Sequence, residues 1–180
     1  FDKLIHDLSC SDEVKKELFC YYYDLFLSLE ILNVLEDIQK NLYVDPKEMD
    51  LLADRICSAL ALEDRDIKNM KETISEWTYE IDEWIRNYKY YSGSEERLKN
   101  MIHGSDMVRK LCNCIKSCIS RFKNVELLIL IDEYENVKYF QEITNTWIRR
   151  VDSLSACSYR IGTRPQGIST YNTEFSEEIR

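Results

Sequence analysis

The stretch that decides the fold is ELLILIDEYENVKYF, Glu126–Phe140, in which five consecutive apolar residues end in two adjacent acids. A continuous apolar run bounded by polar residues is typical of a strand that is buried on both faces, as in a parallel sheet. We therefore predict a buried strand that ends at Ile131 and presents Asp132 and Glu133 at its carboxyl end.

A second strand is predicted downstream of the first. The residues that follow Glu135 return to helical spacing, and the segment CSYRIGTRP, Cys157–Pro165, has the character of a short strand that Pro165 stops. Strand, helix and strand in this order suit a parallel crossover unit, whose strands end at the same edge of the sheet. We therefore expect Thr163 and Arg164 to lie beside the two acids.

The sequence before the first strand is helical in pattern almost throughout. It predicts a helix that begins after Ser11, a helix that Asp45 caps, a coiled-coil-like seam over 67–91, and a helix from Ser105. Few chain breakers occur, with 4 Gly and 2 Pro. The predicted fold is mainly α with a small α/β part. A long-helix bundle or antiparallel coiled-coil arm, residues 1–103, is attached to a partial parallel sheet, residues 104–180.

Composition excludes some classes of function. A net charge of -9 disfavours a nucleic-acid clamp, because an acidic surface repels phosphates. No uninterrupted apolar run reaches the roughly 18 residues of a membrane-spanning helix. The odd count of 7 Cys, in a chain without an export-signal pattern, favours reduced thiols and a cytoplasmic location. Because the first residue is Phe1, we expect a fragment of a longer protein.

The run LLILIDEYEN resembles the Walker B motif of P-loop nucleotide hydrolases. Together with YRIGTRP it resembles bacterial AAA-type ATPases related to origin-recognition proteins, over roughly Val125–Gly167. This resemblance implies the parallel sheet of a P-loop NTPase that binds ATP and Mg²⁺. It also implies that Asp132 binds Mg²⁺, Glu133 is the catalytic base and Thr163 is a sensor residue. Arg164 would contact phosphate in the same or a neighbouring subunit.

The sequence departs from this family in one motif. None of the four glycines begins the Gly-x-x-x-x-Gly-Lys-Ser/Thr loop that cradles phosphates. We expect that loop upstream of Phe1, with the helical arm as an insertion between it and the Walker B strand. ATP and Mg²⁺ would then bind the full-length protein only, and this piece alone would be inactive. The arm would contact a partner protein or another subunit, with DNA as a partner only by family analogy.

Two alternative functions remain open. The chain could be a non-catalytic helical interaction module whose small sheet is structural. Alternatively, Arg97 and His103 in RLKNMIH are similar to the Arg and His pair of helical HEPN ribonucleases.

Two further residue groups favour packing rather than chemistry. Cys112, Cys114 and Cys118 lack a nearby His at ligand spacing, so we expect packed thiols rather than a zinc site. The aromatic groups at 21–23 and 88–91 could stack bases, but their helical positions favour the core.

Overall fold

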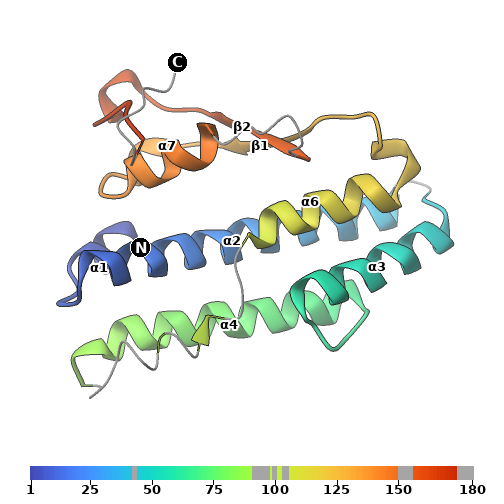
Figure 1. Cartoon of the computed structure of the whole chain (residues 1–180), viewed down its shortest axis with the longest axis horizontal. Coiled ribbons are helices and arrows are strands. Elements are labelled where there is room, and N and C mark those ends of the chain that lie inside the picture. The colour runs from blue at the N-terminus through green and yellow to red at the C-terminus, as the bar shows by residue number, and fades with distance from the viewer. Residues whose placement is uncertain (42–43, 91–97, 99–100, 103–105, 150–155, 174–180) are drawn as a thin grey trace. The chain divides into compact units, whose positions relative to one another are not determined.

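The structure is a computed structural model that describes residues 1–41, 44–90, 98, 101–102, 106–149 and 156–173 (Figure 1). It is mainly helical with a small two-stranded parallel sheet, which confirms the predicted fold class. The chain divides into two compact units. The sheet unit contains Phe1–Cys20 and Glu126–Arg180, and the helical unit contains Tyr21–Val125. The predicted division at residue 103, into an insertion and an ATPase part, concerns function and stays a prediction.

In the described part of the chain, the helical unit contains four long helices. They are α2 (Asp12–Asn41, from Tyr21 onward), α3 (Pro46–Leu60), α4 (Ile67–Asn87, continued by the 3-10 turn η1, Tyr88–Tyr90) and α6 (Met107–Cys118, followed by η2, Ser120–Phe122). Helices α3 and α6 pack side by side (Figure 1). The Asp45 carboxylate accepts the N–H of Lys47 at 2.9 Å, and Pro46 opens α3, as predicted.

Most of the predicted seam lies on the buried face of α4. Ile67, Met70, Ile74, Ile81 and Trp84 of the seam are buried, as is Ile85, whereas Trp77 and Tyr88 are only partly buried. Tyr91 lies outside the described residues. The α-helix itself ends at Asn87, before the predicted end of the seam. Cys112, Cys114 and Cys118 are buried on α6, as the packing interpretation predicted. The core of this unit is therefore apolar and follows the helical periodicity of the sequence.

The start of α6 is held by a side chain of α2. The Asp24 carboxylate accepts the backbone N–H groups of Met107 at 2.7 Å and Val108 at 2.9 Å. These are first-turn donors that have no partner within their own helix. Burial raises the pKa of Asp24, while the two N–H groups act in the opposite direction. Asp24 therefore caps α6 across the bundle.

Helix α2 also has the length and composition of a membrane-spanning helix. Its most apolar 18-residue window has a mean hydropathy of 1.4, and half of that window is buried inside the structure. The core helices of soluble proteins share these properties. Asp24 lies in this helix, and its bonds to α6 favour a bundle helix.

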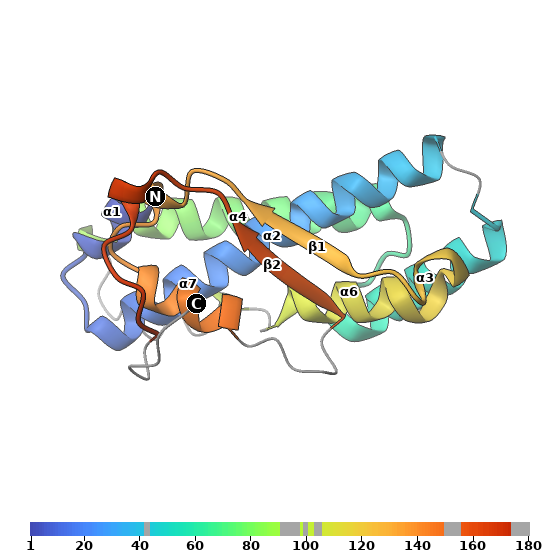
Figure 2. The ribbon, with the colours of Figure 1, turned by 90° about the horizontal axis from the view of Figure 1, so that it is seen from above.

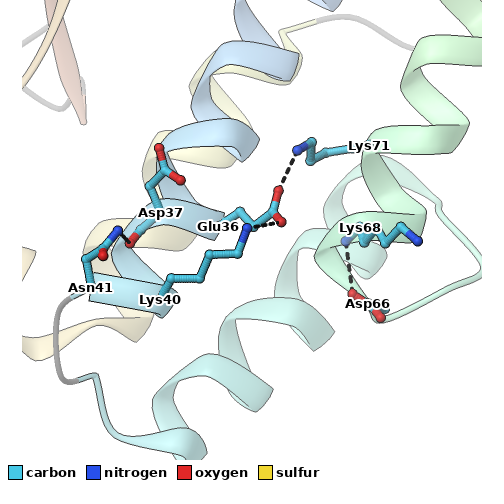
Figure 3. A network of polar contacts seen from close by, with 7 residues as sticks. All are labelled: Glu36, Asp37, Lys40, Asn41, Asp66, Lys68 and Lys71. Carbon is cyan, nitrogen blue, oxygen red and sulfur yellow. Dashed lines mark hydrogen bonds and ion pairs between the residues drawn. The ribbon is translucent and has the colours of Figure 1, made fainter.

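A partly buried ionic contact joins α2 to α4 (Figure 3). The Glu36 carboxylate accepts hydrogen bonds from Lys40 and Lys71, each at 2.5 Å. The bond from Lys40, and then that from Lys71, lowers the pKa of Glu36 to about 2. The carboxylate is therefore ionised at neutral pH and bridges a lysine of its own helix and a lysine of α4.

The sheet unit contains two parallel strands joined through α7 (Figure 2). Its elements are α1 (Asp2–His6), β1 (Leu127–Ile131), η3 (Tyr134–Asn136), α7 (Gln141–Arg149), β2 (Cys157–Ile161) and η4 (Pro165–Gly167). The register pairs Leu127 with Cys157 and Ile131 with Ile161. The predicted strand–helix–strand order is confirmed, although the helix begins only at Gln141 rather than directly after Glu135.

The prediction that β1 is buried on both faces is wrong. Burial alternates along the strand, with Leu128 50% and Leu130 72% exposed, whereas Ile131 is buried. A strand has side chains on both faces of its sheet, and the described elements cover only one face of β1. The apolar run predicted the strand correctly, but it did not predict how much of the strand other elements would bury.

The N-terminal segment belongs to the sheet unit through contacts with residues just before α7. The Asp2 carboxylate accepts the N–H of Tyr139 at 3.0 Å, and His6 stacks on the Tyr139 ring with centroids 4.0 Å apart. Phe19 stacks on Phe140 with centroids 4.5 Å apart. Aromatic contacts of this kind join segments that are far apart in the sequence.

Candidate functional site

The carboxyl ends of β1 and β2 form one edge that carries all four residues singled out from the sequence. The backbone pairing continues past the strands, since Gly162 donates its N–H to the Ile131 carbonyl at 2.7 Å. The Tyr134 N–H then donates to the Gly162 carbonyl at 3.2 Å. These bonds bring the segment that contains Asp132 and Glu133 alongside the segment of Thr163 and Arg164. Their chemical roles stay predictions.

Asp132 lies directly over Gly162. Its Oδ1 accepts the N–H of Glu133 at 2.8 Å, and the carboxylate is exposed. A Cβ atom at position 162 would come 3.0 Å from the same oxygen, closer than ordinary contacts allow without a shift. The glycine therefore leaves room for the Asp132 carboxylate at the edge.

Glu133 has a left-handed backbone, with φ 52° and ψ 41°. This conformation is uncommon for a residue other than glycine, and such residues concentrate at functional sites. Its Oε2 accepts the side-chain N–H of Asn136 at 3.0 Å, and the side chain is exposed. The turn at the end of β1 thus presents Glu133 to solvent with its carboxylate held by a neighbouring amide.

Glu135, which sequence reasoning did not single out, holds the end of β2. The Thr163 hydroxyl donates to Glu135 Oε2 at 2.9 Å, and Arg164 Nε lies 3.6 Å from Oε1. The backbone N–H of Glu135 itself, and then the Thr163 hydroxyl, lowers the pKa of Glu135. Among the contacts of the described residues, the polar groups of Thr163 and Arg164 thus pair with this third acid. No sequence spacing indicated this pairing, because η3 turns Glu135 toward the other strand.

A buried glutamine fixes the segment after β2. Gln141, only 1% exposed at the start of α7, donates from Nε2 to the Gly167 carbonyl at 2.8 Å. Its Oε1 accepts the N–H and the hydroxyl of Ser169, both at 2.8 Å. Buried amides are stable only when such partners are present. Gln141 therefore anchors the loop that carries Arg164 to the first turn of α7.

Asn145 continues this buried polar network one turn later. Its Nδ2 donates to the carbonyls of Thr170 at 3.1 Å and Asn172 at 2.9 Å. Its Oδ1 accepts a hydrogen bond from the Tyr134 hydroxyl at 2.5 Å. The Tyr134 hydroxyl oxygen also lies 3.0 Å from the Gln141 carbonyl. Tyr134 follows the two acids directly, so the network links the turn after β1 to the segment after β2.

The donor set at this edge fits a magnesium–nucleotide better than a dedicated metal cage. Asp132 and Glu133 are exposed carboxylates, which are hard oxygen ligands. Within the described ranges, no three His, Cys, Asp or Glu side chains gather to hold a metal. Mg²⁺ typically binds through one or two carboxylates, and phosphates and waters complete its shell. Asp132 can supply one such carboxylate.

The other candidate catalytic pair is not tested by the structure. Arg97 and His103 both lie outside the residues that the structure describes.

The comparisons with known proteins identify a family. A family model described as ORC-CDC6-like matches residues 2–180, which is nearly the whole chain. No curated protein and no solved structure gave a significant match. The family is related to the AAA+ ATPases, in agreement with the resemblance of the Asp132 and Thr163 segments. The chain belongs to the ORC-CDC6-like family.

Proposed function

We propose that this chain carries the metal-binding and catalytic half of an ATPase site, and that its helical unit contacts a partner protein or another subunit. The observation that carries the proposal is the shared edge, where Asp132 and Glu133 end one strand and Thr163 and Arg164 follow the next. In parallel sheets, ligands bind at the carboxyl ends of the strands. Family membership supports ATP and Mg²⁺ as the ligands.

Each residue of the edge has a distinct role in this proposal. Asp132 holds Mg²⁺, which when bound neutralises charge on the phosphates. Glu133 accepts a proton from the attacking water, and its exposed position leaves it within reach of solvent. Thr163, as the sensor residue, lies beside the reacting phosphate and orients the attacking water. Arg164, whose side chain is 87% exposed, can extend to a phosphate oxygen.

The proposal requires a phosphate-binding loop from outside these 180 residues. The glycines of the chain do not begin such a loop, and backbone N–H groups are needed to cradle the β- and γ-phosphates. The gene that encodes this chain should therefore encode a Gly-x-x-x-x-Gly-Lys-Ser/Thr motif before the Phe1 codon. A complete gene without that motif contradicts the proposal.

The decisive variant is Glu133→Gln in the protein translated from the complete gene. Glutamine cannot accept the proton, while Asp132 still holds the metal. We expect ATP hydrolysis to fall by about a hundredfold or more, in line with the usual contribution of a general base, with little change in ATP affinity. Glu142→Gln is the matched control, because Glu142 is exposed on α7 and the substitution changes the same charge.

The same variant distinguishes the second candidate, a non-catalytic interaction module. The pairing of Thr163 and Arg164 with Glu135 favours this candidate, because it satisfies both residues without a ligand. An interaction module predicts no ATP affinity in the unchanged protein and no effect of Glu133→Gln. Measurable ATP binding by isothermal titration calorimetry would exclude it. By family analogy, DNA and further subunits are the partner classes to test for either function.

A further inference from the structure

We propose that Glu135 is a positioning residue for the end of β2: it takes the only hydroxyl proton of Thr163 and holds the Arg164 guanidinium. Thr163 can then only accept a hydrogen bond at the shared edge. This inference rests on the proposed function and assigns a role to a residue that the Walker B resemblance leaves without one.

The argument begins with the two oxygens of the Glu135 carboxylate. Oε2 accepts from the Thr163 hydroxyl at 2.9 Å, and Oε1 lies 3.6 Å from Arg164 Nε. One acid therefore restrains two consecutive residues of the other strand. Its side chain is 25% exposed, whereas that of Arg164 is 87% exposed. The acid is the more buried member of the pair, so its contact with Arg164 lies at the surface, where a phosphate oxygen can replace it.

Glu135 is also fixed by close packing between η3 and η4. A Cβ atom at Gly167 would lie 2.3 Å from Glu135 Cβ and 3.0 Å from Thr163 Oγ1. No side chain fits there without moving η4 away from η3. Gly167 N–H donates to the Arg164 carbonyl at 2.8 Å, and Gln141 holds the Gly167 carbonyl. Gly167 is therefore held in place by two hydrogen bonds, and its close approach keeps η4 against Glu135 of η3.

The direction of the Thr163 hydrogen bond has a chemical consequence. A hydroxyl has one proton and two lone pairs. The carboxylate of Glu135 at 2.9 Å is a shorter and charged acceptor, compared with the Arg164 carbonyl at 3.2 Å. With its proton committed, Thr163 presents lone pairs to the edge. It can then orient a proton of a water molecule, but it cannot donate to a phosphate oxygen, which leaves phosphate contact to Arg164.

The test uses the protein translated from the complete gene, with ATP and Mg²⁺ as the probes. Glu135→Ala should lower kcat about tenfold to a hundredfold, as misplaced catalytic groups do, with the Kd for ATP changed less than about threefold. The kcat of Glu135→Gln should lie between those of the unchanged protein and Glu135→Ala. The amide oxygen of glutamine still accepts from Thr163, but the side chain lacks the charge that holds Arg164. Gly167→Ala should also lower kcat, because it keeps the Glu135 carboxylate but moves η4 away from η3. Glu142→Ala is the control for charge and should leave kcat unchanged.

A double-mutant cycle separates positioning from general stability. If Glu135 acts in part through the Thr163 hydroxyl, Glu135→Ala should lower kcat less in the Thr163→Val background than in the unchanged protein. Fully additive losses would overturn the inference. An unchanged kcat for Glu135→Ala, in a protein whose unchanged form hydrolyses ATP, would overturn the inference but not the proposed function.

Hydrogen exchange of the nucleotide-free protein provides a readout that does not depend on activity. The Gly167 amide should exchange at least tenfold faster in Glu135→Ala than in the control. Equal exchange rates would overturn the inference. If the exchange rates differ as expected but the unchanged protein binds no ATP, the proposed function fails, and with it the role of Glu135 at a nucleotide.

Discussion

The helical unit and the sheet unit have cores of different chemistry. Among the described residues, seven polar side chains are buried. Ser28 lies in the helical unit, whereas the sheet unit contains Gln141, Thr144, Asn145, Thr146, Ser158 and Thr173. The helical unit is held by apolar side chains at helical spacing, whereas in the sheet unit Gln141 and Asn145 also join distant segments through buried hydrogen bonds. The second kind of core is directional, so it can place side chains at an edge more exactly than apolar packing does.

Asn145→Leu tests this difference between the two cores and should have the largest effect on the free energy of unfolding. The substitution keeps a similar volume but leaves the Tyr134 hydroxyl and the carbonyls of Thr170 and Asn172 without this partner. Because unpaired buried groups are costly, we expect a loss of on the order of 3 kcal/mol in the free energy of unfolding. Urea denaturation followed by circular dichroism measures it.

The matched control for that variant lies in the apolar core. Ile74 is fully buried on α4, and Ile74→Val should cost about 1 kcal/mol, as the loss of one methylene usually does. If Asn145→Leu costs no more than Ile74→Val, the sheet unit does not depend on its polar network, and the comparison is wrong.

Asp24 makes directional hydrogen bonds inside the helical unit, so it tests whether such bonds also stabilise a mainly apolar core. Asp24→Ala leaves the N–H groups of Met107 and Val108 without their acceptor, so we expect a loss of about 1 to 2 kcal/mol in thermal or urea unfolding. Asp24→Asn should cost less than Asp24→Ala, because its single amide oxygen still accepts one of the two N–H groups. An equal cost for both variants would show that the cap needs both carboxylate oxygens.

The smallest expected effect concerns the partly buried bridge of Glu36. Its folded-state pKa is about 2, below the ordinary 4.5, so folding favours the ionised form. The contribution of this bridge to stability is therefore fully present above pH 4.5 and is lost as the pH falls toward 2. A carbon-13 titration of the Glu36 carboxyl measures the pKa directly. In Lys71→Ala, the Glu36 pKa should move up toward its ordinary value, and an unchanged pKa would mean that Lys71 does not form the bridge in solution.

Much of the helical unit could be predicted from residues near one another in the sequence. The cap at Asp45, the proline that opens α3 and the spacing along α4 are local signals, and each appears in the structure. The two strands and their parallel order also followed from local apolar runs. Sequence reasoning failed on the burial of Leu128 and Leu130, because coverage depends on which elements pack against a strand.

The contacts of the candidate site could be predicted only in part. The sequence by itself determined that Asp132 and Glu133 end one strand and that Thr163 follows the next. An apolar run and the polar residues that end it are neighbours in the sequence, so they can be recognised from a short segment. The tertiary structure alone decided that Thr163 pairs with Glu135 and that Gln141 holds the following loop. These hydrogen bonds join residues 26 or more positions apart, and their geometry depends on how the backbone turns after each strand. A local sequence pattern cannot predict that geometry, because the geometry exists only once both strands are paired.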